Sequence, residues 1–301
     1  MGKPWLETPT ESIPQLPAML GGEELQFLYW MGQNSEGLPL IDLGTFLGGS
    51  AAAMAAGAES VGSPSKVYSY DLFKYGNWCK DFDLGEGYEA GDNILPWVTQ
   101  RTAQWADRLE FVKGDITEQT WEHGPTNAIF VDFTQTWHHH NHVCCAFLPH
   151  LKLGGILAHQ DYVYIVCYWL HVWMEHYADH FEQLSPLVMN GTAAWRYVKP
   201  LPEEAFTRGL NEVLTVQEMR ALLDRSIDKY EGVHQGLLQL ARVRFHLHTQ
   251  GPDRAQAEID RLRPSLSAFE NLLPLIGVTQ GNVDTWRTNG GPYPPGFFRT
   301  T

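Results

Sequence analysis

The chain has 301 residues, with 21 Lys and Arg against 35 Asp and Glu, which gives a formal net charge of −14. This length supports a substantial core, either as one large domain with an appendage or as two modest domains. The acidic balance argues against an extended surface for nucleic acid or anionic membranes, because few cations are available to replace phosphate counterions. Four cysteines do not make a disulfide framework. With no apolar signal core and no membrane-length apolar run, we expect a cytoplasmic protein.

The first part of the chain alternates between strand and helix patterns. Residues 1–17 show little apolar periodicity and predict a loose lead-in, and apolar residues at helical spacing follow up to Gln33. The predicted strands are 38–43, 66–71, 109–113, 128–132 and 155–159. Between them, the small residues 49–57 predict a closely packed helix, and 97–107 predict another. Strands separated by helices imply a parallel sheet with helices on both faces.

The second part changes character. A hairpin is predicted from 181–188 and 192–198, with Asn190-Gly191 as its turn, after an aromatic helix at Asp161–His180. Candidate helices then follow at 216–229, 233–249 and 252–262. We therefore expect an α/β fold with a seven-stranded, mostly parallel sheet and a closing antiparallel hairpin in residues 18–202. A C-terminal helical appendage at 203–280 is expected as a lid or a homodimer surface, followed by a Gly/Pro-rich tail at 281–301.

The stretch Ile41–Ser50, with the sequence IDLGTFLGGS, is the most informative. A strand ends near Asp42, glycines from Gly44 onward allow a tight turn, and a helix begins near Ser50. The amides and positive dipole end of a helix N-terminus favour an anionic group, and open α/β sheets bind ligands where their strands end. The spacing differs from the dinucleotide and P-loop patterns, which argues against those nucleotides. A tight turn without a ligand is the alternative.

Acidic residues follow the next strands as well. Asp71 ends the second strand, where a carboxylate can accept hydrogen bonds from the two hydroxyls of a ribose. Asp115 follows the third strand and Asp132 the fourth. Any one of these acids alone is more often a turn-capping residue. Acids at four successive strand ends, with Asp42 as the first, predict a polar ligand site at one edge of the sheet.

Five motifs together resemble those of class I S-adenosylmethionine (SAM) dependent methyltransferases, over about residues 18–200: IDLGTFLGGS, VYSYDLF, LEFVKGDITE, AIFVDFT and LPHLKLGGILAHQDY. The resemblance implies a Rossmann-like domain that takes SAM as co-substrate and a small molecule as its partner, with no nucleic acid and no membrane. It implies that Gly44, Thr45 and Phe46 hold the methionine part of SAM, Ser50 its carboxylate, Asp71 the ribose, Asp115 with Ile116 the adenine, and Asp132 the sulfonium and amino group. Asp42 and Leu72 complete the expected cofactor-binding set.

Nine of the 13 histidines lie between His138 and His180. In related methyltransferases the region after the fourth strand faces the acceptor, so the resemblance makes His139 or His140 the candidate base. His138 and His142 have metal-ligand spacing on a helix, but no Cys or carboxylate completes a tetrahedral set, and we favour a polar pocket wall. The expected catalytic residues are Asp132, His140, Asn141 and Tyr177.

Asp132 and Asp161 end neighbouring predicted strands. In catechol-type and sugar O-methyltransferases, carboxylates at similar places hold Mg²⁺, which orients and acidifies a hydroxyl. A third acidic ligand is not evident here. We therefore expect no metal, with Asp132 steering SAM and Asp161 capping the aromatic helix that follows. Some rings of that helix can line the sulfonium, because aromatic faces attract cations.

Two alternatives stand beside methyl transfer with release of S-adenosylhomocysteine. The sequence more loosely resembles the azetidine-2-carboxylate synthases, which share the fold. In these enzymes the amine of SAM attacks its own γ-carbon and releases methylthioadenosine, and Asn141 and Tyr177 resemble what that pocket requires. The other alternative is a non-catalytic binding or scaffold protein that uses residues 203–278 to engage a partner. The acids at every strand end weigh against it.

Overall fold

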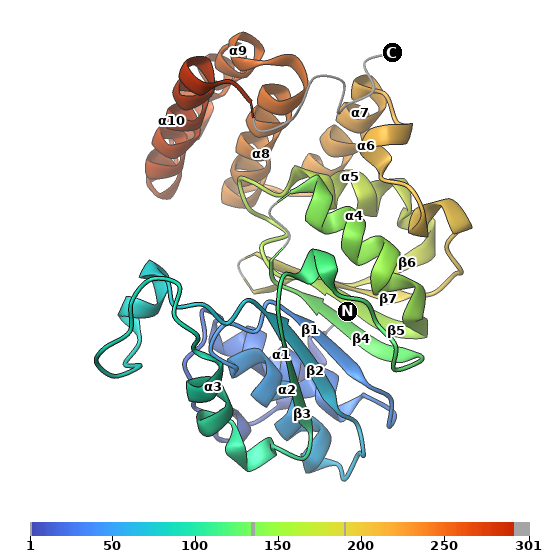
Figure 1. The fold of residues 1–301 in the computed structure, drawn as a ribbon. Helices are drawn as coiled ribbons and strands as arrows, with labels where there is room; N and C mark the ends of the chain where they lie inside the picture. Colours follow the sequence, from blue (N-terminus) through green and yellow to red (C-terminus); the bar gives the residue numbers. More distant parts are fainter. Residues whose placement is uncertain (1, 134–135, 190, 292–301) are drawn as a thin grey trace. The chain divides into compact units, whose positions relative to one another are not determined.

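The structure is a computed structural model that describes residues 2–133, 136–189 and 191–291. The chain forms two compact units (Figure 1). The first, here called the sheet unit, comprises Met1–Phe133, His142–Gln160 and His180–Pro200. The second, the helical unit, comprises Thr134–Asn141, Asp161–Asp179 and Leu201–Thr301. Helix α4 (Trp137–Ala146) contributes residues to both units.

The sheet unit is built on seven strands (Figure 1). They are β1 (Leu40–Leu43), β2 (Val67–Asp71), β3 (Leu109–Lys113), β4 (Thr126–Val131), β5 (Leu151–His159), β6 (Phe181–Met189) and β7 (Thr192–Tyr197). Their order is β3-β2-β1-β4-β5-β7-β6, and β7 runs antiparallel to both β5 and β6 while the other neighbours are parallel. The predicted sheet with its closing hairpin is confirmed, although Asn190 of the predicted turn lies outside the described residues. The strand order reverses between β1 and β4, where open α/β sheets bind their ligands.

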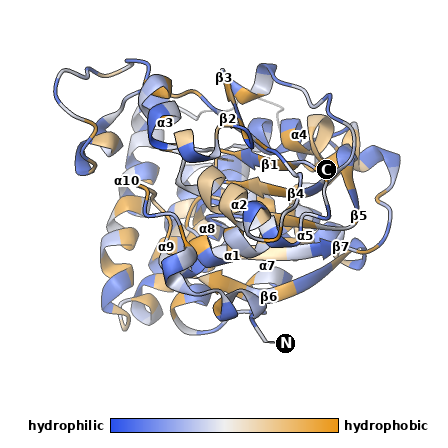
Figure 2. Cartoon of the chain, turned by 90° about the horizontal axis from the view of Figure 1, so that it is seen from below, coloured by the Kyte–Doolittle hydropathy of each residue, from blue (hydrophilic) through white to orange (hydrophobic). Residues whose placement is uncertain are grey.

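Helices α1 (Gly22–Gln33) and α2 (Gly49–Ser60) pack on one face of this sheet and against each other (Figure 2). A Cβ added to Gly57 would overlap the carbonyl oxygen of Tyr29, and one added to Gly32 would overlap that of Met54. The two helix backbones are therefore in direct contact. The close packing predicted for the small residues 49–57 is confirmed, because no larger side chain fits where the helices cross.

The N-terminal segment is packed into the core, not loose as the sequence suggested. Trp5 is fully buried, its ring packs edge-on against Phe27 with centroids 5.0 Å apart, and its indole N–H donates to Glu23 at 3.0 Å. Lys3 forms an ion pair with the same carboxylate at 2.7 Å. The segment is anchored by one large aromatic side chain, and a single anchor leaves no periodic pattern in the sequence.

The predicted aromatic helix Asp161–His180 is wrong at its start. Residues 161–166 form turns and bends, and α5 extends only over Tyr168–His176. The N-cap of α5 is Cys167, so Asp161, which lies well before the helix begins, does not cap it. The predicted helix 97–107 is also shorter, since α3 covers Leu95–Arg101 and is followed by a single 3₁₀ turn.

The helical unit contains α5 and the helices C-terminal to the sheet: α6 (Leu210–Val213), α7 (Val216–Ile227), α8 (Gly232–Gln250), α9 (Pro252–Leu266) and α10 (Leu273–Asn289). The predicted helices of α7, α8 and α9 are confirmed. Helix α10 continues through the region expected to be a tail from residue 281, and residues 292–301 of that tail lie outside the described part of the chain. Residues 161–179, expected within the 18–202 domain, belong to this unit. No helix in the described ranges is long and apolar enough to cross a bilayer.

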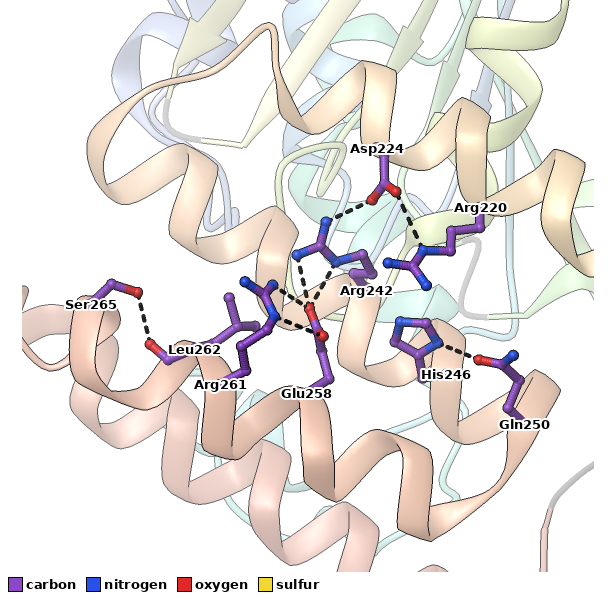
Figure 3. Close-up of polar contacts among 9 residues, drawn as sticks. All are labelled: Arg220, Asp224, Arg242, His246, Gln250, Glu258, Arg261, Leu262 and Ser265. Carbon is purple, nitrogen blue, oxygen red and sulfur yellow. Dashed lines mark hydrogen bonds and ion pairs between the residues drawn. The ribbon is translucent and has the colours of Figure 1, made fainter.

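Arg242 of α8 joins α7, α8 and α9 through ion pairs (Figure 3). Its guanidinium lies 2.6 Å from Asp224 of α7 and 2.8 Å from Glu258 of α9, and Arg261 places a second cation 2.6 Å from Glu258. The side chain of Glu258 is 3% exposed. Burial alone raises the pKa of a carboxyl, but the hydrogen bonds and charges of Arg261 and Arg242 outweigh it and lower the pKa of Glu258 to about 2.

We expect Glu258→Gln to destabilise the helical unit by on the order of 2–4 kcal/mol at neutral pH, because it leaves two guanidinium groups without their shared carboxylate. A depressed carboxyl pKa contributes stability that is present above the unfolded value near 4.5 and is lost as the pH falls through about 2. Urea unfolding should therefore show the gap between wild type and variant closing between about pH 4.5 and pH 2. The exposed Glu270→Gln is the matched control, and a gap that stays constant with pH would contradict this account.

Candidate functional site

The carboxyl end of β1 is organised around the buried side chain of Asp42. One of its oxygens, Oδ2, accepts hydrogen bonds from the hydroxyls of Thr45 at 2.7 Å, Ser50 at 2.9 Å and Ser69 at 3.0 Å. These donors come from the glycine loop, the first turn of α2 and strand β2. Ser69 was not expected as a partner from the sequence. The signal that could have identified it is a hydroxyl in an otherwise apolar strand, at the position that pairs with Asp42 in the sheet.

Asp42 supports the loop from beneath. Its side chain is fully buried, and burial raises its pKa to about 6, an effect that the three hydroxyls offset only in part and that the charge of Asp71 reinforces. Its other oxygen, Oδ1, has no hydrogen-bond partner among the described residues. A carboxyl with this pKa gains or loses its proton close to neutral pH. Its observed contacts hold together the residues expected to bind the cofactor.

The pH dependence of folding tests this carboxyl. Because the folded-state pKa of Asp42 is raised, its contribution is complete below the unfolded value near 3.8 and is lost as the pH rises through about 6. Wild type should therefore lose on the order of 3 kcal/mol relative to Asp42→Asn between about pH 4 and pH 7, as measured by urea unfolding. Asp107→Asn, at an exposed carboxyl, should show no such trend. A pH-independent difference between wild type and Asp42→Asn would refute the assignment.

Gly44 brings the ends of β1 and β4 together. Its φ is +100°, and an added Cβ would lie 2.5 Å from the backbone carbonyl oxygen of Asp132. The backbone N–H of Asp132 in turn donates to the carbonyl of Leu43 at 2.7 Å. Any residue other than glycine would both strain this turn and collide with β4. Two of the residues expected beside one ligand, Gly44 and Asp132, are thus adjacent at the point where the strand order reverses.

Asp71 ties the glycine loop to the end of β2. Its Oδ2 accepts the backbone N–H of Phe46 at 2.8 Å, and its Oδ1 accepts that of Phe73 at 2.7 Å. Both phenylalanines have positive φ, +53° and +47°, a conformation that costs energy for residues with a Cβ. Burial raises the pKa of Asp71, and these hydrogen bonds oppose the rise. Each carboxylate oxygen keeps a second lone pair, so a ribose hydroxyl can still be accepted.

The other expected cofactor residues lie at the ends of β2 and β3. Leu72 is 47% exposed. Asp115 is exposed, and its Oδ1 accepts both the backbone N–H of Thr117 at 2.9 Å and its hydroxyl at 2.8 Å. Ile116, the next residue, is half-buried and begins a 3₁₀ turn. Since the contacts of Asp115 are those of a turn-capping residue, its adenine-binding role stays a prediction.

His140, expected as a catalytic residue, lies in an aromatic cluster of the helical unit. It is 1% exposed, and its ring packs edge-on against Trp137 and Trp173 at centroid distances of 6.2 and 5.7 Å. Burial lowers its pKa to about 3. A general base must hold a proton during the reaction, and this environment disfavours the protonated ring. These features weigh against His140 and leave the half-buried His139 as the other expected base.

Asn141 and Tyr177 also belong to the helical unit. The amide of Asn141 donates to Asn211 at 3.0 Å, which links α4 to α6. Tyr177 is buried and packs on Trp173 with ring centroids 4.8 Å apart. His140 and Tyr177 therefore meet on a shared tryptophan, whereas the fourth expected catalytic residue, Asp132, belongs to the sheet unit. Their joint participation in catalysis stays a prediction.

The described residues provide no set of ligands for either metal site that the sequence analysis considered. In residues 2–133, 136–189 and 191–291, no three His, Cys, Asp or Glu side chains are grouped as they would be around a metal ion. Asp132 and Asp161, the pair considered for Mg²⁺, belong to different units. In the histidine pair, His138 is exposed while a ring nitrogen of His142 lies 2.8 Å from the carbonyl oxygen of Gln119.

The part of the chain that forms this edge of the sheet is similar to known proteins. Residues 41–162 match a family model described as a methyltransferase domain. No curated protein gave a significant match. One similar solved structure is the O-methyltransferase NovP, with 14% identity, a TM-score of 0.48, and an alignment that covers 60% of this chain and 82% of that chain. Another is a SAM-dependent O-methyltransferase from Thermotoga maritima, with 17% identity, a TM-score of 0.42, and coverage of 62% of this chain and 69% of that chain. A Podospora anserina methyltransferase with bound S-adenosylhomocysteine is also similar, with 14% identity, a TM-score of 0.40, and coverage of 60% of this chain and 80% of that chain.

The family match and the seven-stranded topology define a methyltransferase domain with the Rossmann-like fold. The resemblance predicted from the motifs is therefore confirmed over residues 41–162, which match a methyltransferase domain.

Proposed function

We propose that this protein transfers the methyl group of SAM to a small molecule and releases S-adenosylhomocysteine. The observation that carries the proposal is the glycine loop of the methyltransferase domain, which Asp42 supports from below and Asp71 fixes from the side. Asp42 lies on β1, which borders the switch point of the sheet where open α/β folds bind ligands, and Asp71 ends the adjacent strand β2.

Each residue of this edge has a chemical task in the proposal. Asp71 accepts hydrogen bonds from the ribose hydroxyls. The first turn of the twelve-residue helix α2 offers free backbone N–H groups and a positive dipole end to the carboxylate of SAM. Gly44 presents bare backbone, which allows the methionine part to approach closely, and Asp132 places a carboxylate beside the sulfonium and amino group.

Methyl transfer is an in-line displacement in which the acceptor atom attacks the methyl carbon and the sulfonium leaves as a thioether. The main contribution of the protein is therefore to hold donor and acceptor in line. A base near the acceptor adds to the rate only if the acceptor must lose a proton, and His139 is the residue we propose for that task.

Asp71→Ala should weaken SAM binding at least tenfold, because it removes the ribose acceptor and both anchors of the loop, and charged hydrogen bonds contribute about 1.5–3 kcal/mol each. Calorimetric titration with SAM and with S-adenosylhomocysteine measures the change. Asp81→Ala, at an exposed carboxylate in the segment that follows β2, is the matched control and should bind as wild type does. Undiminished affinity in Asp71→Ala would remove the ribose from this position.

Mass spectrometry of the purified protein incubated with SAM decides the reaction. With SAM alone we expect no turnover, and with a panel of hydroxyl- and amine-bearing small molecules we expect S-adenosylhomocysteine and a product heavier by one methylene. Release of methylthioadenosine from SAM alone would replace methyl transfer with SAM cyclisation. Failure of calorimetry to detect SAM or S-adenosylhomocysteine binding would instead favour the scaffold reading.

A further inference from the structure

A second candidate binding site lies wholly within the helical unit, between α8 and α10. A cavity of about 330 Å³ is lined there by Arg244, Leu247 and His248 of α8 and by Asn282, Val283 and Trp286 of α10. Within each helix these residues are three and four positions apart, so they share one face. The volume is at the lower end of the range of small-molecule sites, roughly 300–1,000 Å³. One face of each helix thus encloses space for a small ligand.

Arg244 contributes a positively charged guanidinium group to the lining of this cavity. Its Nε is buried without a hydrogen-bond acceptor in the described part of the chain, and none of the ion pairs there includes its guanidinium. Arg242, two residues earlier on α8, is by contrast paired with Asp224 and Glu258. None of the ion pairs in the described part of the chain neutralises the guanidinium of Arg244, so a carboxylate that contacts its terminal nitrogens from the cavity supplies the missing counter-charge. The planar guanidinium fork matches a carboxylate best.

His248 and Trp286 also line this cavity, and their rings are stacked on one another, so that a ligand can contact their outer faces and edges. Their ring centroids are 5.3 Å apart at an angle of 24°. The hydroxyl of Tyr168 accepts the indole N–H of Trp137 at 3.2 Å and lies 3.1 Å from Nδ1 of His248, to which it can donate its own proton. Burial lowers the pKa of His248 to about 3, so the ring is neutral. Uncharged aromatic rings favour contact with an apolar ring over a polyphosphate.

We propose that the cavity between α8 and α10 binds a small planar aromatic carboxylate. The carboxylate pairs with Arg244, and the ring packs against His248 and Trp286 and the apolar side chains beside them. Every residue involved belongs to the helical unit, so the proposal does not depend on SAM binding or on methyl transfer.

Calorimetric titration of the full-length protein without SAM tests the ligand class. The probes are cinnamate, its neutral amide cinnamamide, and cyclohexanecarboxylate, which keeps the charge but lacks the planar ring. Cinnamate should bind at least tenfold more tightly than either, because only cinnamate satisfies both the guanidinium and the ring surface. Absence of cinnamate binding, or equal binding of the amide, would overturn the proposal.

Variants locate the binding. Arg244→Gln should abolish the preference for cinnamate over cinnamamide, whereas Arg254→Gln, at an exposed arginine of α9 that does not line the cavity, should preserve it. Asn282→Trp places a bulky ring at an exposed lining position, so it should block cinnamate without disturbing the core, and an unchanged melting temperature confirms its fold. Wild-type cinnamate affinity in both Arg244→Gln and Asn282→Trp would place the ligand elsewhere and reject this site.

Discussion

The arrangement of the proposed cofactor site depends on the burial of one carboxyl group. Asp42 lies beneath the glycine loop, and burying it costs free energy that three hydroxyls partly offset. Because those hydroxyls come from the loop, from α2 and from β2, satisfying one oxygen fixes three elements relative to one another. Gly44 then allows the loop to touch the backbone of Asp132 on the neighbouring strand. The edge is preorganised by protein contacts alone, which lowers the cost of ordering it around a ligand.

The histidines, the most conspicuous feature of the composition, are mostly packing residues where their surroundings are described. His140 lies among tryptophans, and His171 is fully buried with one ring nitrogen 2.6 Å from the carbonyl of Tyr162 and the other 2.8 Å from the hydroxyl of Ser226. Burial lowers the pKa of His171 to about 4, as it lowers that of His140 to about 3. Such rings are neutral near pH 7, and they provide aromatic surface with built-in hydrogen-bonding groups. A cluster of histidines in a sequence therefore indicates chemistry only when its members remain accessible.

Much of the fold and part of the site could be predicted from the sequence because they rest on local patterns. Apolar runs bounded by glycines identify β1 and its turn, and small residues identify the close contact at α2. The sequence motifs also placed Gly44, Asp71 and Asp132 at strand ends that the structure gathers at one edge. Features that depend on distant contacts were missed, namely the anchoring of Trp5 and the hydrogen bond of Ser69, and so was the continuation of α10 beyond residue 280.

The sequence by itself determined the class of fold and the edge of the sheet that carries the glycine loop, because strand periodicity and turn residues act between neighbours in the chain. Only the tertiary structure decided what those side chains contact. It turned Asp42 inward, it gave Asp115 the contacts of a turn cap, and it assigned residues 161–179 to the helical unit. The reason is that burial and hydrogen-bond partners depend on segments far apart in the sequence. A short stretch of sequence does not determine which distant segment will pack against it.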